Sequence, residues 1–169
     1  MVRKSVIFFL VFMQMILLSS CMGGRIIIYD DREEKADNRV EQIISLIINN
    51  DRESLKSLFS EKALDEANDI DDGIDSLFNF LQGDIHSWKR DGLTSERINS
   101  YSKQSIRNNF SIIIDTDIDS FNIYVIDYNK DTINPENEGV YMLEISKTSY
   151  SGEWDSWQNR MSAGVHIVE

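Results

Sequence analysis

The stretch SIRNNFSIIIDTDIDSFNIYVIDY, residues 105–128, decides the fold of this chain. It holds two runs rich in β-branched and aromatic residues, 105–116 and 120–128, on either side of the acidic segment Asp117 to Asp119. Apolar and polar residues tend to alternate in these runs, with the period of two that is typical of half-buried strands. Aspartate is a frequent turn residue. The stretch therefore predicts two strands joined by a turn, with a buried face that other elements must cover.

The residues before this stretch have helical periodicity. Residues 32–48 follow a pair of aspartates that can cap a helix. Asp51 can cap a second, short helix, and Ser60 a third that continues to Gly83 and can divide at Gly73. Each helix is apolar on one side only, so we expect the helices to cover the sheet. The stripe of the first helix consists of Val40, Ile43, Ile44, Ile47 and Ile48.

Further strands surround the central hairpin. We expect a strand over residues 84–90 that ends at an Asp91-Gly92 turn, and later strands over 140–145 and 164–168. A polar loop, residues 129–138, separates the hairpin from these later strands. Helices followed by hairpin-linked strands are the mark of an α+β protein. The sequence therefore predicts one domain, residues 32–169, with N-terminal helices packed on an antiparallel sheet.

The first residues are typical of a secretory signal. Two basic residues precede an apolar run, residues 6–18, that is too short to span a bilayer comfortably. The run ends in Leu-Ser-Ser-Cys, which resembles the lipobox of bacterial lipoproteins, and Cys21 is the only cysteine in the chain. The resemblance implies a signal peptide over 1–20, cleavage after Ser20 and acylation of Cys21. The alternative is an ordinary secretory signal followed by an unrelated cysteine.

This leader predicts where the protein works. Residues 21–31 would form the acylated cysteine and its tether, and the lipid would attach the domain to the bacterial cell membrane on the extracytoplasmic side. An acylated Cys21 leaves no thiol, which excludes disulfides, a thiolate nucleophile and a cysteine-based zinc site. A doubly acylated cysteine would anchor the protein stably, because one acyl chain gives only marginal membrane binding and two give stable binding.

The net charge limits the partners. The chain has a formal net charge of -12, and the leader contains two basic residues and no acidic one, so the mature chain is still more acidic. Nucleic acids and anionic lipid headgroups are polyanions, and such a surface repels them. We therefore expect no nucleic-acid partner. The membrane would be reached through the lipid on Cys21.

Several short motifs together resemble a known family. They are Asn50-Asp51 with Leu55 to Ser60, Leu77 to Phe80 with Gly83 to Ile85 and Ser87-Trp88, Tyr124 to Asp127, Asn134 to Asn137, and Ala163 to Glu169. They resemble a family of bacterial lipoproteins with a domain of unknown function. That family is similar to the nuclear transport factor 2-like, or cystatin-like, cone, in which helices lie on a strongly curved antiparallel sheet. The resemblance implies this fold and location, and it implies no activity.

Aromatic residues on the expected strands are candidates for a ligand pocket. Cones of this kind often enclose a pocket between helix and sheet, and small-molecule sites combine apolar walls with a few polar groups. The alternative is that the same side chains fill the concavity. The candidate pocket residues are His86, Trp88, Tyr101, Tyr124, Tyr141 and Trp154.

The polar loop offers a candidate calcium site. Asp127, Asn129, Asp131 and Glu138 occupy positions one, three, five and twelve of an EF-hand-like loop. Thr132 stands where such loops have glycine, and the flanking residues favour strands over helices. The alternative is an ordinary polar connection between strands. Calcium is therefore a possible cofactor, and no other cofactor is expected.

The sequence favours binding over catalysis. His86 or Asp84 with Tyr101 or Tyr124 could supply a base and an oxyanion donor, but the spacing does not require it. The phosphate-loop, nucleophile-elbow, metalloprotease and dinucleotide motifs do not occur in the sequence. We expect a non-catalytic module that binds a small apolar ligand or an envelope protein, with dimerisation through the sheet also open. The alternatives are a small cone enzyme of isomerase, cyclase or hydrolase type, and a calcium-dependent surface protein.

Overall fold

The computed structural model describes residues 31–149 and 163–168. Residues 31–169 form one compact unit. Ser20, Cys21 and Trp154, which the sequence singles out, lie outside the described residues. Within the described residues no helix has the length and apolar character needed to cross a membrane.

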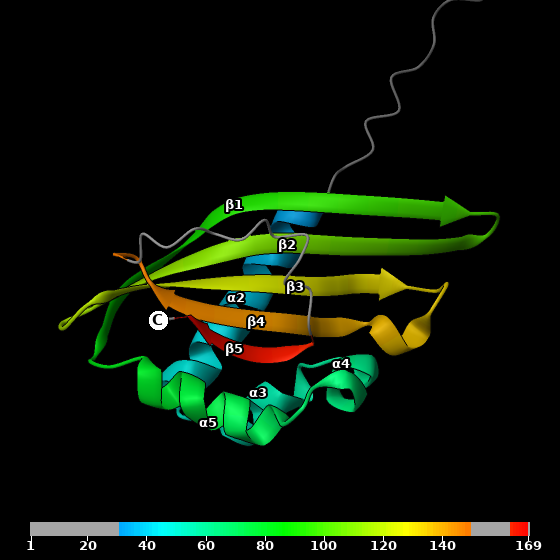
Figure 1. Cartoon of the computed structure of the whole chain (residues 1–169). Helices are drawn as coiled ribbons and strands as arrows, with labels where there is room; N and C mark the ends of the chain where they lie inside the picture. Colours follow the sequence, from blue (N-terminus) through cyan, green and yellow to red (C-terminus); the bar gives the residue numbers. More distant parts are fainter. Residues whose placement is uncertain (1–30, 150–162, 169) are drawn as a thin grey trace, which may run out of the picture. The chain divides into compact units, whose positions relative to one another are not determined.

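Helices come first along the chain and a sheet follows, which confirms the α+β class (Figure 1). The sheet is mixed and has the strand order β1-β2-β3-β4-β5, and α2 crosses one of its faces. The helices α3, α4 and α5 lie along the β5 side (Figure 1). The elements are α2 (Arg32–Ile48), α3 (Arg52–Ser57), α4 (Glu61–Glu66), α5 (Ile70–Phe80), β1 (Ile85–Ser100), β2 (Lys103–Thr116), β3 (Ser120–Asp131), the 3-10 helix η2 (Pro135–Asn137), β4 (Gly139–Lys147) and β5 (Gly164–Val168).

The central hairpin forms as the sequence predicts. β2 and β3 pair antiparallel with Ile112 opposite Ile123. Thr116 closes the turn, because its backbone N–H donates to the Asp119 carbonyl and its hydroxyl accepts from the N–H groups of residues 118 and 119. Alternate residues of both strands then face α2 and are buried. They are Phe110, Ile112 and Ile114 on β2, and Phe121, Ile123 and Val125 on β3.

The apolar stripe of α2 covers this face. Val40, Ile43, Ile44 and Ile47 are buried, as the period predicts. Ile48 is an exception, since 58% of it is exposed: the helix ends there and Asn49 follows as its C-cap. The stripe is therefore one residue shorter than expected.

The third predicted helix divides at a different place. It breaks between α4 and α5, where the Asp69 carboxylate accepts the N–H groups of residues 71 and 72. Gly73 lies inside α5 and does not end it. A glycine suits this position because the helix packs closely on β5: a Cβ at Gly73 would lie 3.0 Å from Cβ of Val165. The predicted caps Asp51 and Ser60 are confirmed, since their side chains accept from Ser54 N and Ala63 N respectively.

The predicted Asp91-Gly92 turn is wrong. β1 continues for 16 residues and pairs with β2 along its length. A register shift between Asp91 and Leu93 marks a bulge, in which Gly92 has a φ of +67°. Glycines with positive φ occur in both turns and bulges. Here the residues on both sides of Gly92 pair with β2, so Gly92 forms a bulge within one strand.

The expectation of a purely antiparallel sheet is also wrong. β5 pairs parallel to β4, with Leu143 opposite Val165. A parallel partner needs a crossover connection of a dozen or more residues, which the chain between β4 and β5 is long enough to supply. The predicted strand boundaries, residues 164–168, are confirmed.

A second parallel contact joins the helices to β4. Phe59 forms a parallel bridge with Val140, in which Ser60 N donates to Val140 O over 2.9 Å and Val140 N donates to Leu58 O over 2.8 Å. Gly139, with a φ of +123°, makes this approach possible. A Cβ there would lie 2.9 Å from the Leu58 carbonyl oxygen and 3.0 Å from Ser60 N.

Alanine substitutions at two glycines should separate conformational strain from steric overlap. Gly92→Ala meets no atom within 4 Å and carries only the cost of positive φ, about 1–2 kcal/mol. Gly139→Ala has a φ of +123°, still less accessible to an alanine, and also pushes against backbone, so we expect a loss that is larger by about 1–3 kcal/mol. Urea unfolding of both variants measures the difference. Equal losses would contradict the close contact between residues 58–60 and β4.

Candidate functional site

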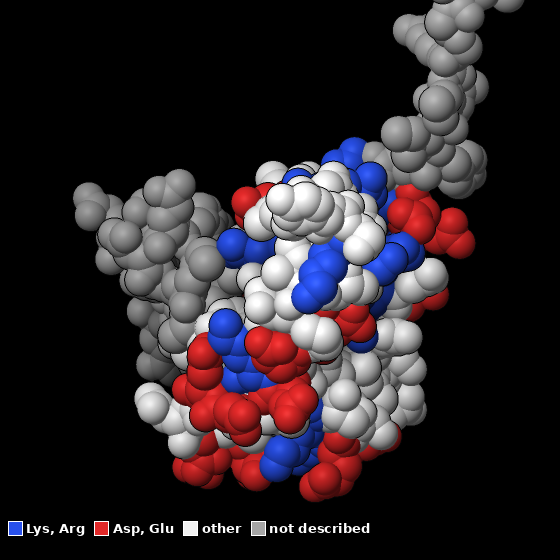
Figure 2. Space-filling model, turned by 90° about the vertical axis from the view of Figure 1, so that its right-hand side faces the viewer, with Lys and Arg blue, Asp and Glu red and all other residues white. Residues whose placement is uncertain are grey.

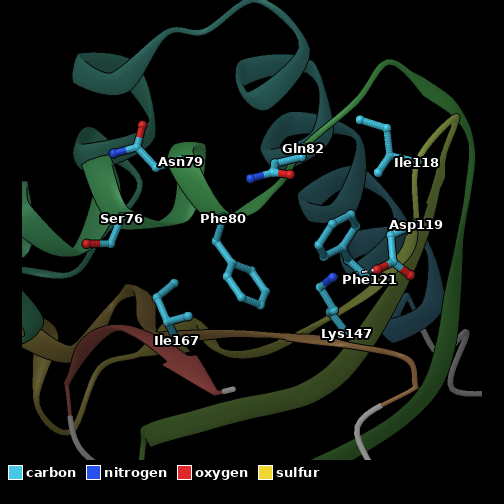
Figure 3. A pocket seen from close by; sticks show the side chains of 9 residues that line it. All are labelled: Ser76, Asn79, Phe80, Gln82, Ile118, Asp119, Phe121, Lys147 and Ile167. Atoms are coloured by element: carbon cyan, nitrogen blue, oxygen red, sulfur yellow. Dashed lines mark ion pairs between the residues drawn. The ribbon is translucent and has the colours of Figure 1, made fainter.

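A cleft of about 550 Å³ opens between the end of α5 and the neighbouring ends of the strands (Figure 3). Its volume lies within the range of small-molecule sites. The lining side chains come from α5, the residues after it, the β2–β3 turn, β3, β4 and β5. They are Ser76, Asn79, Phe80, Gln82, Ile118, Asp119, Phe121, Lys147 and Ile167.

The cleft has an apolar floor. The rings of Phe80 and Phe121 meet edge to face with centroids 5.7 Å apart. Phe121 is a core residue of β3, whereas Phe80 extends from α5 toward β5 (Figure 3). Ile118 and Ile167 add aliphatic surface, and 64% of Ile118 is exposed at the turn. The floor therefore presents apolar surface to the opening.

The cleft also has a polar rim. Lys147 Nζ lies 2.7 Å from Asp119 Oδ2, and this contact lowers the pKa of the Asp119 carboxyl below its usual value. Ser76, Asn79 and Gln82 place a hydroxyl and two amides on the α5 side (Figure 3). The arrangement can hold a ligand that is apolar at one end and forms hydrogen bonds at the other.

A row of polar side chains whose polar atoms are buried forms a second unusual feature. Ser95, Asn108 and Asp127 are opposite one another on β1, β2 and β3. Cross-strand partners point to the same face of a sheet, and Asn108 and Asp127 are fully buried. The Ser95 hydroxyl and both polar atoms of Asn108 have no hydrogen-bond partner within the described residues. Such atoms are costly in a core unless water or a ligand satisfies them.

Arg39 of α2 lies over this row. Its Nε is 2.9 Å from Asp127 Oδ1, although no hydrogen bond of regular geometry from the described residues reaches either carboxylate oxygen. Burial raises the pKa of the Asp127 carboxyl, and the Arg39 guanidinium opposes that shift. Asp127 is fully buried, whereas 21% of the Arg39 side chain is exposed. Asp127 therefore needs Arg39 to compensate its buried charge, whereas Arg39 can still be partly solvated without Asp127.

The predicted calcium residues are divided between two environments. Asp127 faces Arg39, as described above. Asp131 is used by its own loop: Oδ1 accepts from the N–H groups of residues 133 and 134, and Oδ2 accepts from Asn137 and Ser105. Burial disfavours the Asp131 charge, but these hydrogen bonds outweigh it, and its pKa is lowered. Glu138 Oε1 accepts from the Asp131 backbone N–H over 2.8 Å.

Asn129 completes the predicted calcium set. It lies in a register shift of β3, and its buried Nδ2 has no hydrogen-bond partner within the described part of the chain. No group of three or more His, Cys, Asp or Glu side chains suited to a metal occurs in residues 31–149 and 163–168. Calcium binding at this loop stays a prediction.

The predicted pocket aromatics are spread over the sheet. His86 and Trp88 lie near the start of β1, and Tyr101 lies beyond its other end, fully exposed. A 16-residue strand spans about 50 Å. Asp84 also lies at the His86 end, where its backbone N–H donates to Asp117. The structure therefore does not bring His86 or Asp84 next to Tyr101.

Two tyrosines occupy the middle of the sheet. Tyr124 is half-buried on the face opposite α2, and burial raises the pKa of its hydroxyl. Tyr141 stacks edge to face on Tyr128 and donates to Glu66 over 2.7 Å. Burial and Glu66 raise the pKa of Tyr141 to about 12. Neither tyrosine lines the cleft of Figure 3.

Sequence reasoning missed the residues that matter most here. Asn108 shares the alternation of Ile106, Phe110 and Ile112, so the sequence pattern alone places a polar residue on the buried face of this strand. Arg39 lies beside the apolar stripe of α2, and no local pattern marks it as the partner of Asp127. The cleft residues come from four separate stretches of sequence, which only the folded chain brings together.

Substitutions of the ion pair should have unequal effects. Arg39→Met leaves a buried carboxylate without its partner, and we expect a loss of about 3–5 kcal/mol at neutral pH. Asp127→Asn leaves a guanidinium that already reaches solvent, and we expect a smaller loss. The double variant should be more stable than Arg39→Met alone. Urea unfolding measures all three, and equal single losses would contradict the asymmetry.

The pH dependence of Arg39→Met gives a second test of the pair. Because the folded pKa of Asp127 is above the ordinary value of 3.8, the folded state binds the proton more tightly than the unfolded state. The stability contributed by that proton is lost as pH rises through the folded pKa. The deficit of Arg39→Met should therefore shrink as pH is lowered, and Arg39→Met/Asp127→Asn should not show this change.

Comparison with known proteins gives a family and no function. Curated proteins yielded no match. A family model described as Domain of unknown function (DUF5104) matches residues 42–152, more than half of the chain. The match begins within α2 and includes both strands of the central hairpin and β4. The chain therefore belongs to this family, the domain of unknown function DUF5104.

Proposed function

We propose that this chain is a non-catalytic binding module, anchored by lipid on the extracytoplasmic side of the bacterial cell membrane. Its ligand is a small, largely apolar molecule with a hydrogen-bonding end. The cleft between α5 and the strand ends carries this proposal, because it combines an aromatic floor with a polar rim. Apolar contact gives such a site its affinity, and a few polar groups orient the ligand.

The chemistry of the rim supports binding over proton transfer. Among the described residues that line the cleft, Asp119 and Lys147 are the ionisable ones, and they pair with each other. A general base would need a free carboxylate or imidazole beside the reacting atom. A small cone enzyme and a calcium-dependent surface protein remain the alternative predictions from the sequence.

The proposed location depends on the leader. The basic start, the apolar run and the Leu-Ser-Ser-Cys ending support acylation of Cys21. Helices on one face of a curved sheet are compatible with the nuclear transport factor 2-like cone, which we propose as the finer description of the fold. An envelope protein bound at the same surface, or a second copy of this chain, is the alternative partner.

Blocking the cleft should abolish ligand binding. Residues 31–169 form a compact unit with its own core, so a chain that begins at Met22 keeps the fold. Native mass spectrometry of this chain should show an adduct that is lost on denaturation. Ser76→Trp fills the rim and should remove it, whereas Asp65→Trp on the exposed side of α4 should not. An adduct that survives Ser76→Trp would place the ligand elsewhere.

Substitution of the cysteine tests the location. The full chain should be recovered from bacterial membranes with a mass that includes acyl groups on Cys21. Cys21→Ser removes the acyl acceptor, so that mass increment should disappear. Wild-type protein that carries no acyl group would contradict the anchor while leaving the cleft proposal intact.

A further inference from the structure

The tip of the β1–β2 hairpin exposes large apolar side chains. Ile98 is 50% exposed, and Tyr101 is fully exposed at the turn between Ser100 and Lys103. The two residues are three positions apart at the end of the sheet away from the cleft. Exposed apolar side chains that lie near one another on a soluble domain mark a contact site more often than a single exposed side chain does.

The backbone at Tyr101 is unusual as well. Its φ is +54°, in the left-handed region, and it occupies the first central position of a two-residue turn. Glycine is the preferred residue there, and a bulky side chain with positive φ is strained. Full exposure means that packing within the described residues does not repay this strain. Strained positions of this kind cluster at functional sites.

Basic residues surround the tip of this acidic protein. Arg97 and Lys103 lie on the hairpin itself, and Lys130 is opposite Ile106 on the next strand. None of the three forms an ion pair within the described residues, whereas Arg52, Lys56 and Lys147 elsewhere each pair with an aspartate. Arg97 also interacts electrostatically with Asp31, whose pKa it helps to lower, so the positive charge of the tip comes mainly from Lys103 and Lys130.

Figure 2 shows this arrangement from the hairpin end. Lys and Arg side chains lie around an uncharged bulge in the upper half of the view, with some Asp and Glu side chains beside them, and most Asp and Glu side chains lie in the lower half, where Lys and Arg are interspersed among them. The net charge of the chain opposes contact with an anionic surface, and the uncharged bulge with its neighbouring Lys and Arg is the part of this end where that opposition is weakest.

We propose that the β1–β2 tip rests on an anionic lipid surface, with Tyr101 and Ile98 in the headgroup region and Arg97, Lys103 and Lys130 against the phosphates. Tyrosine suits this depth because its ring is apolar and its hydroxyl is wet. Basic side chains near an anionic leaflet add attraction that salt screens. The proposal rests on the proposed anchor, which brings the domain to the membrane, and it is independent of the cleft.

The single cysteine makes a direct test possible. In the acylated full chain Cys21 has no free thiol, so Ser102→Cys supplies a unique site at the tip for an environment-sensitive fluorophore. Asn68→Cys, exposed between α4 and α5, is the matched control. Each labelled chain is placed in phosphatidylcholine vesicles that contain spin-labelled lipid, with or without phosphatidylglycerol. Mass spectrometry of the chain shows whether Cys21 is acylated. If it is not, its free thiol would also take up the fluorophore, so Cys21→Ser is added to each variant, and the labelled chain is mixed with the same vesicles.

We expect lipid quenching at position 102 and not at position 68, at least several-fold stronger with phosphatidylglycerol and weakened by salt. Arg97→Glu/Lys103→Glu should abolish it. Tyr101→Gly should also weaken it without lowering the thermal midpoint, because glycine relieves the positive φ. Equal quenching at both positions, or quenching unchanged by Tyr101→Gly, would overturn the proposal. A missing acyl group with quenching at position 102 would refute the anchor alone.

Discussion

Burial of the helix-facing side of the β2–β3 hairpin is the constraint on which the rest of this structure depends. The face carries Phe110, Ile112 and Ile123 at full burial, and α2 covers it with its own apolar stripe. Neither element can bury this surface alone, since a single helix or a two-stranded hairpin is marginal in water. The other strands extend the sheet, and α3 to α5 close the core at the β4 and β5 side.

The same packed face contains its main irregularity. Asn108 and Asp127 interrupt the apolar alternation at positions that the sheet commits to the core. Arg39 offsets the charge of Asp127, but it leaves the Asn108 amide without a partner in the described structure. Buried polar groups are retained in proteins where they specify one arrangement or serve a site. In this row the loss of Arg39 would leave a buried charge uncompensated, which is among the costly kinds of single substitution.

The two ends of the hairpins differ in chemistry. At the β2–β3 turn, aromatic and amide side chains form a cleft with one internal ion pair. At the β1–β2 turn, cations that form no ion pair within the described part of the chain lie near exposed apolar residues. Our proposals assign a ligand to the first end and a lipid surface to the second. An orientation in which the tip meets the membrane would leave the cleft at the far end of β2, open to the surroundings.

The sequence by itself determined the element types, the β2–β3 hairpin, the caps at Asp51 and Ser60, and the order of helices before strands, because periodicity and capping are local. Only the tertiary structure decided that β1 continues past Gly92, because pairing with β2 overrides the local turn signal. It also decided the parallel direction of β5, which depends on a partner strand distant in sequence. It alone placed Arg39 on Asp127 and assembled the cleft. The physical reason is range: these contacts join residues whose sequence neighbourhoods carry no information about each other.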